Sequence, residues 1–158
     1  MKLLSGLALM VLIGSVNARA QDKAGQLAII VGKSSSLDSI TTAEMQKYFK
    51  AEKTKLPDGT KIVIVMHDVG LPEREAALAN IYKMSEAEYN DYFVGQTFTG
   101  AVAAAPKAFS SAAAVKQYVA ATPGAIGYLR ASDADDTVKV LKVDGKAPGE
   151  ADYKLKMK

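Results

Sequence analysis

Few side chains in this sequence could carry out catalysis. His67 is the only histidine, and the chain contains no cysteine. A zinc site would need carboxylates for nearly all of its ligands, which is unusual, and any catalytic triad would depend on this one histidine. The serine runs at 34–36 and 110–111 do not lie in a nucleophile-elbow pattern, and the chain has no phosphate-loop or dinucleotide-binding glycine motif. We therefore predict no catalytic residue, no metal site and no cofactor, and a hydrolase would lack a base beside a nucleophile.

Anion binding is better supported than catalysis. In open α/β sheets, free backbone N–H groups and the helix dipole favour anions where a strand ends and a helix begins. Two such loops are predicted, one at residues 34–39 and one at 67–71. The predicted ligand-binding residues are Ser34, Ser35, Ser36, His67 and Arg74.

Two alternatives weaken this prediction. The serine run is also typical of an ordinary solvated loop. After the second loop, Glu73 and Glu75 lie in the first helical turn, where they satisfy the dipole and repel an anion. Arg74 opposes these two carboxylates only partly.

Alternating strands and helices must position these loops. Apolar β-branched runs predict strands at 26–31 and 61–66, a third strand is predicted at 125–128, and a fourth strand with its turn is predicted at 137–145. Capping-box pairs predict helices that begin after Thr41 and Ser85, Pro72 fits the first position of another helix, and a fourth helix is predicted within 110–121. Residues 95–109 read as a long connection, and only the last two strands could pair as a hairpin. This order predicts one small α/β domain of two or three layers.

The stretch "TPGAIGYLR" at residues 122–130 combines a proline, two glycines and a tyrosine. Pro123 cannot continue a helix, and Gly124 adopts positive φ at little cost. We predict that a helix stops here and that a buried strand follows through Ala125, Ile126 and Tyr128.

The first twenty residues resemble a secretory signal peptide. A basic start at Lys2, an apolar stretch over residues 3–16 and Ala18-Arg19-Ala20 predict cleavage after Ala20. An uncleaved N-terminal anchor is the alternative, although the apolar stretch is short for a membrane span. We expect an exported periplasmic protein with one domain at residues 21–158, without stable membrane insertion after cleavage.

The charge of the chain gives little support for a nucleic-acid partner. The precursor carries 20 Lys and Arg against 17 Asp and Glu, and cleavage removes Lys2 and Arg19. The remaining domain is nearly neutral, so no basic surface is predicted from composition.

Several segments resemble, in order, a family of small proteins similar to the substrate-binding component of phosphate ABC transporters. The most specific segment is Pro123-Gly124-Ala125-Ile126-Gly127-Tyr128. The stretch Phe98-Thr99-Gly100 matches a second signature. Pro57-Asp58-Gly59 matches a third, with Leu56 in place of its usual tryptophan.

The resemblance implies one lobe of a periplasmic binding protein fold of the second type, with a mixed sheet flanked by helices. In that fold two α/β lobes close on an oxyanion, and full-length relatives have roughly twice this chain. The implied ligand is phosphate or another small anion. A single lobe supplies half of the cleft, so enclosure would need a homodimer or a partner such as a transporter permease or another periplasmic protein.

The sequence departs from this family at its anion-binding segment. Where the transporter components carry an arginine followed by serine-glycine-threonine, this chain carries His67 and then Leu71-Pro72-Glu73. Each missing charge-assisted bond forfeits about 1.5 to 3 kcal/mol. The resemblance therefore leaves two functions open.

The first function is a non-enzymatic solute-binding domain. The second is an accessory protein-interaction module that has lost its ligand, with an exposed aromatic group as its contact surface. The aromatic candidates Tyr89, Tyr92, Phe93 and Phe98 recur with helical period, which more often indicates a core.

Overall fold

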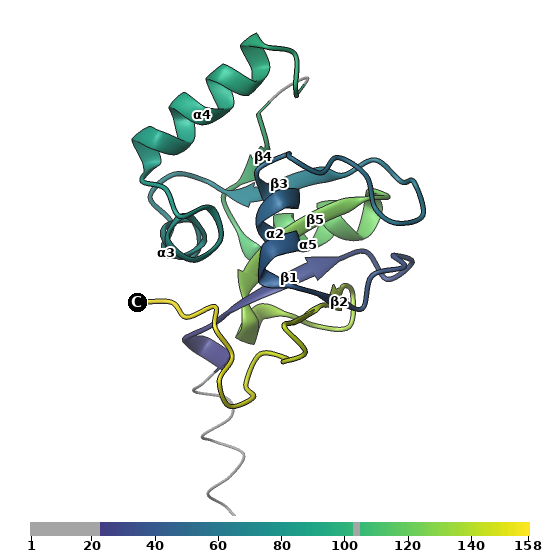
Figure 1. Cartoon of the computed structure of the whole chain (residues 1–158). Coiled ribbons are helices and arrows are strands. Elements are labelled where there is room, and N and C mark those ends of the chain that lie inside the picture. Colours follow the sequence, from purple (N-terminus) through teal and green to yellow (C-terminus); the bar gives the residue numbers. More distant parts are fainter. Residues whose placement is uncertain (1–22, 103–104) are drawn as a thin grey trace, which may run out of the picture.

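The computed structural model describes residues 23–102 and 105–158, so the predicted signal peptide lies outside the described residues. The described chain forms a mixed α/β fold around a five-stranded sheet (Figure 1). In chain order the elements are β1 Leu27–Val31, β2 Ser39–Ile40, α2 Thr42–Phe49, β3 Val63–His67, α3 Pro72–Ala77, η1 Leu78–Tyr82, α4 Glu86–Phe98, β4 Lys107–Phe109, α5 Ala112–Ala121, β5 Ala125–Arg130, η2 Ala131–Asp133, β6 Lys139–Val140 and β7 Lys142–Val143.

The direction of the strands decides where each loop lies. The sheet has the order β4-β3-β5-β1-β6. Strand β3 runs parallel to both β4 and β5, whereas β1 runs antiparallel to β5 and β6. The expected hairpin of the last two strands is wrong, because both edges of β5 are occupied by β3 and β1, and β6 pairs with the other edge of β1.

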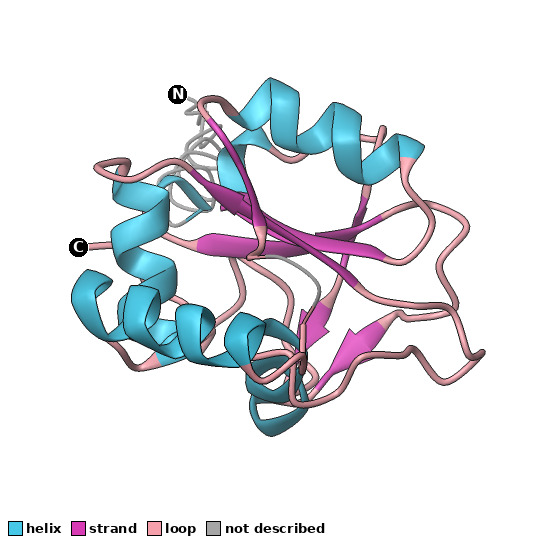
Figure 2. Ribbon diagram, turned by 90° about the horizontal axis from the view of Figure 1, so that it is seen from above, coloured by secondary structure: helices cyan, strands magenta, loops and turns pink. Residues whose placement is uncertain are grey.

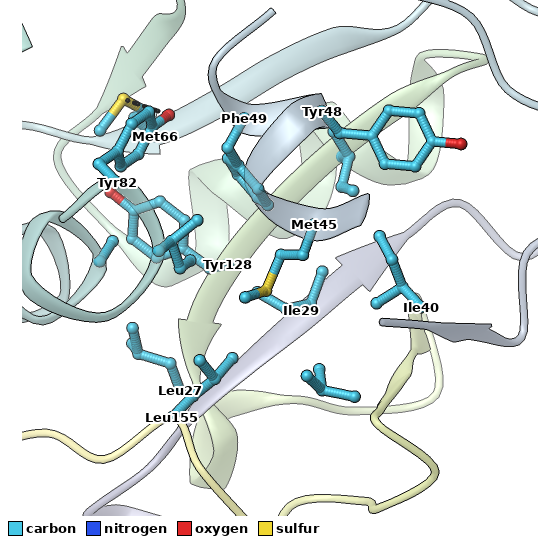
Figure 3. Packing of buried hydrophobic residues seen from close by; sticks show 14 of the residues in the cluster. Leu27, Ile29, Ile40, Met45, Tyr48, Phe49, Met66, Tyr82, Tyr128 and Leu155 are labelled. Atoms are coloured by element: carbon cyan, nitrogen blue, oxygen red, sulfur yellow. Dashed lines mark hydrogen bonds between the residues drawn. The ribbon is translucent and has the colours of Figure 1, made fainter. Parts of the chain in front are cut away.

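Helices cover both faces of the sheet, which makes three layers (Figure 2). Helix α5 covers one face, where Val115 and Val119 pack with Ala28 and Ile30 of β1. Helices α2, α3 and α4 and the π-helical η1 lie on the other face, and their buried side chains form one core cluster with Ile29 of β1. Figure 3 shows part of this larger core, including the hydrogen bond from the Tyr82 hydroxyl to Met66 Sδ.

The start of each predicted helix follows from local sequence. Thr41 and Glu44 form the predicted capping box of α2, and Ser85 and Glu88 form that of α4. Pro72 occupies the beginning of α3, where its missing N–H costs no hydrogen bond. These three predictions are confirmed.

The predicted long connection at residues 95–109 is only partly a connection. Helix α4 continues through it to Phe98, and residues 107–109 form β4. Strand β4 has three residues at the sheet edge and pairs only with β3. Such a short strand carries too few residues for a two-residue periodicity to indicate it.

The predicted helix stop and following strand at residues 122–130 are confirmed. Helix α5 ends at Ala121 and β5 begins at Ala125. Gly124 has a φ of +78°, and a Cβ atom there would overlap the carbonyl oxygen of Lys61. The Val63 N–H donates to the Gly124 carbonyl at 3.0 Å. Gly124 therefore brings the turn directly against the residues that lead into β3.

Candidate functional site

The carboxyl ends of three parallel strands meet at one end of the sheet. His67 of β3 lies opposite Phe109 of β4, and the Asp68 N–H donates to the Phe109 carbonyl at 2.9 Å. The loop at residues 68–71 and the start of α5 are therefore neighbours. Ligands in open α/β sheets collect at this kind of edge.

His67 is buried inside this end of the sheet. Its side chain is 2% exposed, and Nε2 donates to the Tyr128 carbonyl at 3.2 Å. The Nδ1 atom has no hydrogen-bond partner among the described residues. Burial lowers the pKa of His67 from 6.5, and the acidic groups of Glu73, Asp133 and Asp68 only partly oppose that shift. The ring is therefore kept neutral and is not presented to an anion.

Arg74 is also directed inward. Its guanidinium binds Glu86 through two hydrogen bonds and donates from Nη1 to the His67 carbonyl at 3.0 Å. The guanidinium carbon lies 4.8 Å from the centroid of the Tyr89 ring. The side chain is 6% exposed. Its charge is paired with Glu86 in the interior, so it is not available to a ligand at this edge.

The nearby cation Arg130 is paired with a carboxylate as well, although its side chain is 33% exposed. Its Nε and Nη2 atoms donate to Glu73 Oε1 at 3.1 and 3.0 Å. The pair offsets the repulsion that Glu73 alone would exert on an anion. The edge consequently offers hydroxyl and backbone N–H donors rather than a free positive charge.

The start of α5 contributes donors that the sequence reasoning did not assign to this edge. Ser111 caps α5, and its Oγ accepts from the Ala114 N–H at 3.2 Å. The first turn of α5 contains no acidic residue. Ser110 and Ser111 follow β4 directly. Because the sequence predicts a connection at residues 95–109 and no strand end before these serines, it does not indicate them as anion ligands. A serine pair before an alanine-rich helix was the available signal.

The serine loop lies at the opposite end of the sheet. Val31, at the end of β1, pairs with Ile126 near the beginning of β5, whereas His67 lies near the end of β5. The structure therefore groups Ser34, Ser35 and Ser36 with one another but separates them from His67 and Arg74. The five predicted ligand-binding residues therefore do not share one pocket, because β1 runs antiparallel to β5.

The surroundings of the serine loop are acidic. Ser34 and Ser35 line a cavity of about 130 Å³ together with Asp58 and the turn at 122–124. The Ser36 hydroxyl donates to Asp58 Oδ2 at 3.2 Å, and hydrogen bonds from Thr60 lower the pKa of Asp58. A carboxylate at the mouth of this small cavity disfavours an anion.

The aromatic residues that were candidates for a contact surface divide into core and surface. Tyr89 and Phe93 are buried, Tyr92 is half-buried, and Phe98 is 92% exposed. The helical spacing of these residues thus places most of the group in the core, as that pattern usually indicates.

No group of three or more His, Asp or Glu side chains in the ranges 23–102 and 105–158 could hold a metal ion. Within the same ranges, no helix is both long and apolar enough to cross a membrane.

No protein-family model and no curated protein matches the chain. Solved structures do resemble it. An ABC-type phosphate transport receptor from Vibrio cholerae has a TM-score of 0.64 at 18% identity, over 78% of this chain and 48% of the receptor. A putative phosphate ABC transporter substrate-binding protein from Clostridium perfringens, solved with bound phosphate, has a TM-score of 0.65 at 20% identity. The match covers 80% of this chain and 49% of that protein.

A third structure, PstS from Borrelia burgdorferi, has a TM-score of 0.59 at 18% identity, over 78% of this chain and 49% of its own. The chain thus spans about half the length of these proteins. Its fold is that of a single lobe of a phosphate transporter substrate-binding protein, as the sequence resemblance implied.

Proposed function

We propose that this chain is a non-enzymatic, periplasmic solute-binding domain that binds a small oxyanion, with phosphate as the first candidate. The observation that carries the proposal is the lobe fold shared with the two phosphate transport proteins, one of which was solved with phosphate bound. The fold supplies a scaffold on which strand ends and helix N-termini converge.

Within this scaffold, we assign the anion to the carboxyl ends of β3 and β4. Ser110, Ser111 and the backbone N–H groups of Val69 and Gly70 are the proposed donors, because the N–H groups of Asp68 and Leu71 already donate within the protein. His67 and Arg74 act indirectly, because Arg74 holds the His67 carbonyl and both side chains are buried. The three serines at 34–36 form a separate candidate at the other end of the sheet.

A single lobe provides one wall of a cleft. The chain spans about half of the proteins whose fold it shares, so a second copy or a periplasmic partner, such as a transporter permease, would have to supply the other wall. Without that wall and without a free arginine, affinity should be low. We expect a dissociation constant near 1 mM, which corresponds to about −4 kcal/mol.

Isothermal titration of the purified protein with phosphate and with sulfate tests the proposal. The informative variant is Ser111→Asp, because aspartate caps a helix as well as serine does but repels an anion. We expect this variant to lose phosphate binding and keep its melting temperature. The triple variant Ser34→Ala, Ser35→Ala, Ser36→Ala should bind as the unmodified protein does.

Two outcomes would count against the proposal in different ways. If the triple serine variant loses binding and Ser111→Asp does not, the anion belongs at the serine loop. If neither anion produces heat at concentrations of several times the expected dissociation constant, the chain does not bind phosphate or sulfate as a free lobe.

A further inference from the structure

A groove of about 620 Å³ lies at the amino end of β3, away from the carboxyl-end loops. Strand β4 begins opposite Val65, so it does not cover the preceding residues of β3. These residues, 62–64, line the groove together with parts of α2, α4 and α5. Its volume lies within the range of small-molecule sites in proteins.

Three lysines give this groove a positive character. Lys53, Lys61 and Lys107 come from three separate segments and all line it. Lys53 Nζ lies 4.9 Å from the centroid of the Tyr48 ring, and Lys107 Nζ lies 5.0 Å from that of Tyr118. These cation–π contacts place two ammonium groups against groove-lining aromatic rings.

Acidic neighbours do not cancel this charge within the groove. None of the described residues that line it is Asp or Glu. Lys53 has one carboxylate nearby, that of Glu44 at 3.7 Å, but both side chains of this pair are more than 40% exposed and such pairs are weak. A lining that contains three lysines and no acidic residue among those described favours a negatively charged ligand.

Most of the other lining residues are apolar, although Thr54 and Thr97 also line the groove. Ile62, Ile64 and Phe93 line the groove and belong to the larger core or pack against it. Tyr118 packs against Phe109 with the two ring planes tilted by 41° and the centroids 5.0 Å apart, and both rings lie against the smaller core on the α5 face of the sheet. In Figure 3 the Tyr48 ring extends from α2 away from Tyr82 and Tyr128. A hydrated inorganic ion would leave this apolar surface exposed to water, whereas an apolar ligand body would bury it.

We propose that this groove binds an organic anion with a flat apolar or aromatic body and one carboxylate or similar acidic group. The body lies against the partly buried Ile62, Ile64 and Tyr118, and the acidic group pairs with the groove lysines. This site is independent of the proposed phosphate site, because it lies at the other end of β3 and uses different residues.

The test is a calorimetric titration of the purified protein with 2-naphthoate and with its neutral analogue 2-naphthamide. We expect binding of the acid and at least about tenfold weaker binding of the amide. The triple variant Lys53→Gln, Lys61→Gln, Lys107→Gln should weaken binding of the acid by about tenfold or more. A matched triple, Lys33→Gln, Lys142→Gln, Lys146→Gln, removes the same charge at exposed positions outside the groove and should change binding by less than about twofold.

The proposal is overturned if the acid does not bind, if the amide binds as tightly as the acid, or if the two triple variants weaken binding equally. The last result would mean that net charge alone attracts the probe. Thermal melts establish that each variant is folded before titration. Phosphate titration of the same variants keeps the two proposals apart, because phosphate binding at the carboxyl-end loops should not respond to the groove lysines.

Discussion

Arg74 and Glu86 form a two-point ion pair that joins α3 to the first turn of α4. Arg74 Nε donates to Glu86 Oε2 at 2.8 Å, and Nη2 donates to Oε1 at 2.6 Å. The hydrogen bonds from Arg74 lower the pKa of Glu86. The one predicted anion ligand that carries a permanent charge is thus used to hold the helical layer together.

We expect Arg74→Lys to lower the free energy of unfolding by about 2 to 3 kcal/mol. Lysine cannot make two parallel bonds to Glu86 and also reach the His67 carbonyl. Urea denaturation at pH 7 measures the change. Lys154→Gln, which removes an exposed pair with Asp144, should cost less than about 1 kcal/mol. Equal losses in the two variants would show that Arg74 has no special structural role.

Gly124→Ala should be far more damaging than Gly59→Ala, although both glycines have positive φ values, +78° and +85°. A methyl group at Gly124 would overlap the Lys61 carbonyl and lie 3.0 Å from Thr60 Cγ2, whereas Gly59 has open space. We expect about 1 to 2 kcal/mol of destabilisation at Gly59 from backbone conformation alone and a clearly larger loss at Gly124. Denaturant midpoints compare the two, and similar midpoints would contradict the close approach.

His67 should make the protein less stable in mild acid. Burial lowers the pKa of His67 in the folded state below 6.5. In mild acid the unfolded chain therefore binds a proton at His67 that the folded chain does not bind. Stability therefore falls as the pH drops below about 6.5 and stops falling below the folded-state pKa. In urea titrations from pH 8 to 5, His67→Gln should show a smaller decrease than the unmodified protein. Parallel curves would rule out His67 as the source.

Asp144 should contribute stability that is lost at lower pH. It accepts hydrogen bonds from the Thr42 N–H at 2.8 Å, from Thr42 Oγ1 at 2.7 Å and from Lys154 Nζ at 2.9 Å. These hydrogen bonds, chiefly those from Thr42, lower the pKa of Asp144 to about 2. The contribution is present above the unfolded value of 3.8 and is lost as the pH falls towards 2. We expect Asp144→Asn, which tolerates the positive φ of 51°, to cost about 1 kcal/mol at pH 7, because the amide accepts fewer and weaker hydrogen bonds than the carboxylate. The cost should shrink as the pH approaches 2. A constant difference across this range would contradict the role of the carboxylate.

Phe93 and Phe98 test which part of α4 belongs to the core. Phe93 is 2% exposed and packs edge-on against Tyr82, whereas Phe98 is 92% exposed. Phe93→Ala should cost about 3 kcal/mol or more, and Phe98→Ala should change stability by less than about 0.5 kcal/mol. Thermal melts of both variants measure the difference. A large loss at Phe98 would mean that its ring is covered in solution, for example by another copy of the chain.

Local sequence determined most of the elements. Thr41 with Glu44 and Ser85 with Glu88 start helices because each pair satisfies N–H groups a few residues away. Pro123 and Gly124 end α5 for equally local reasons. The resemblance carried by residues 123–128 also predicted the lobe fold, which the solved phosphate transport proteins bear out.

Tertiary structure alone decided which of these elements meet. Sequence periodicity does not report strand direction, so it could not indicate that β1 runs antiparallel and takes Ser34–Ser36 to the far end of the sheet. Nor could the residue type of Arg74 reveal that Glu86, twelve positions away, holds its guanidinium in the interior. Capping and turn formation depend on neighbours in the chain, whereas the availability of a charge depends on partners that only folding brings into contact.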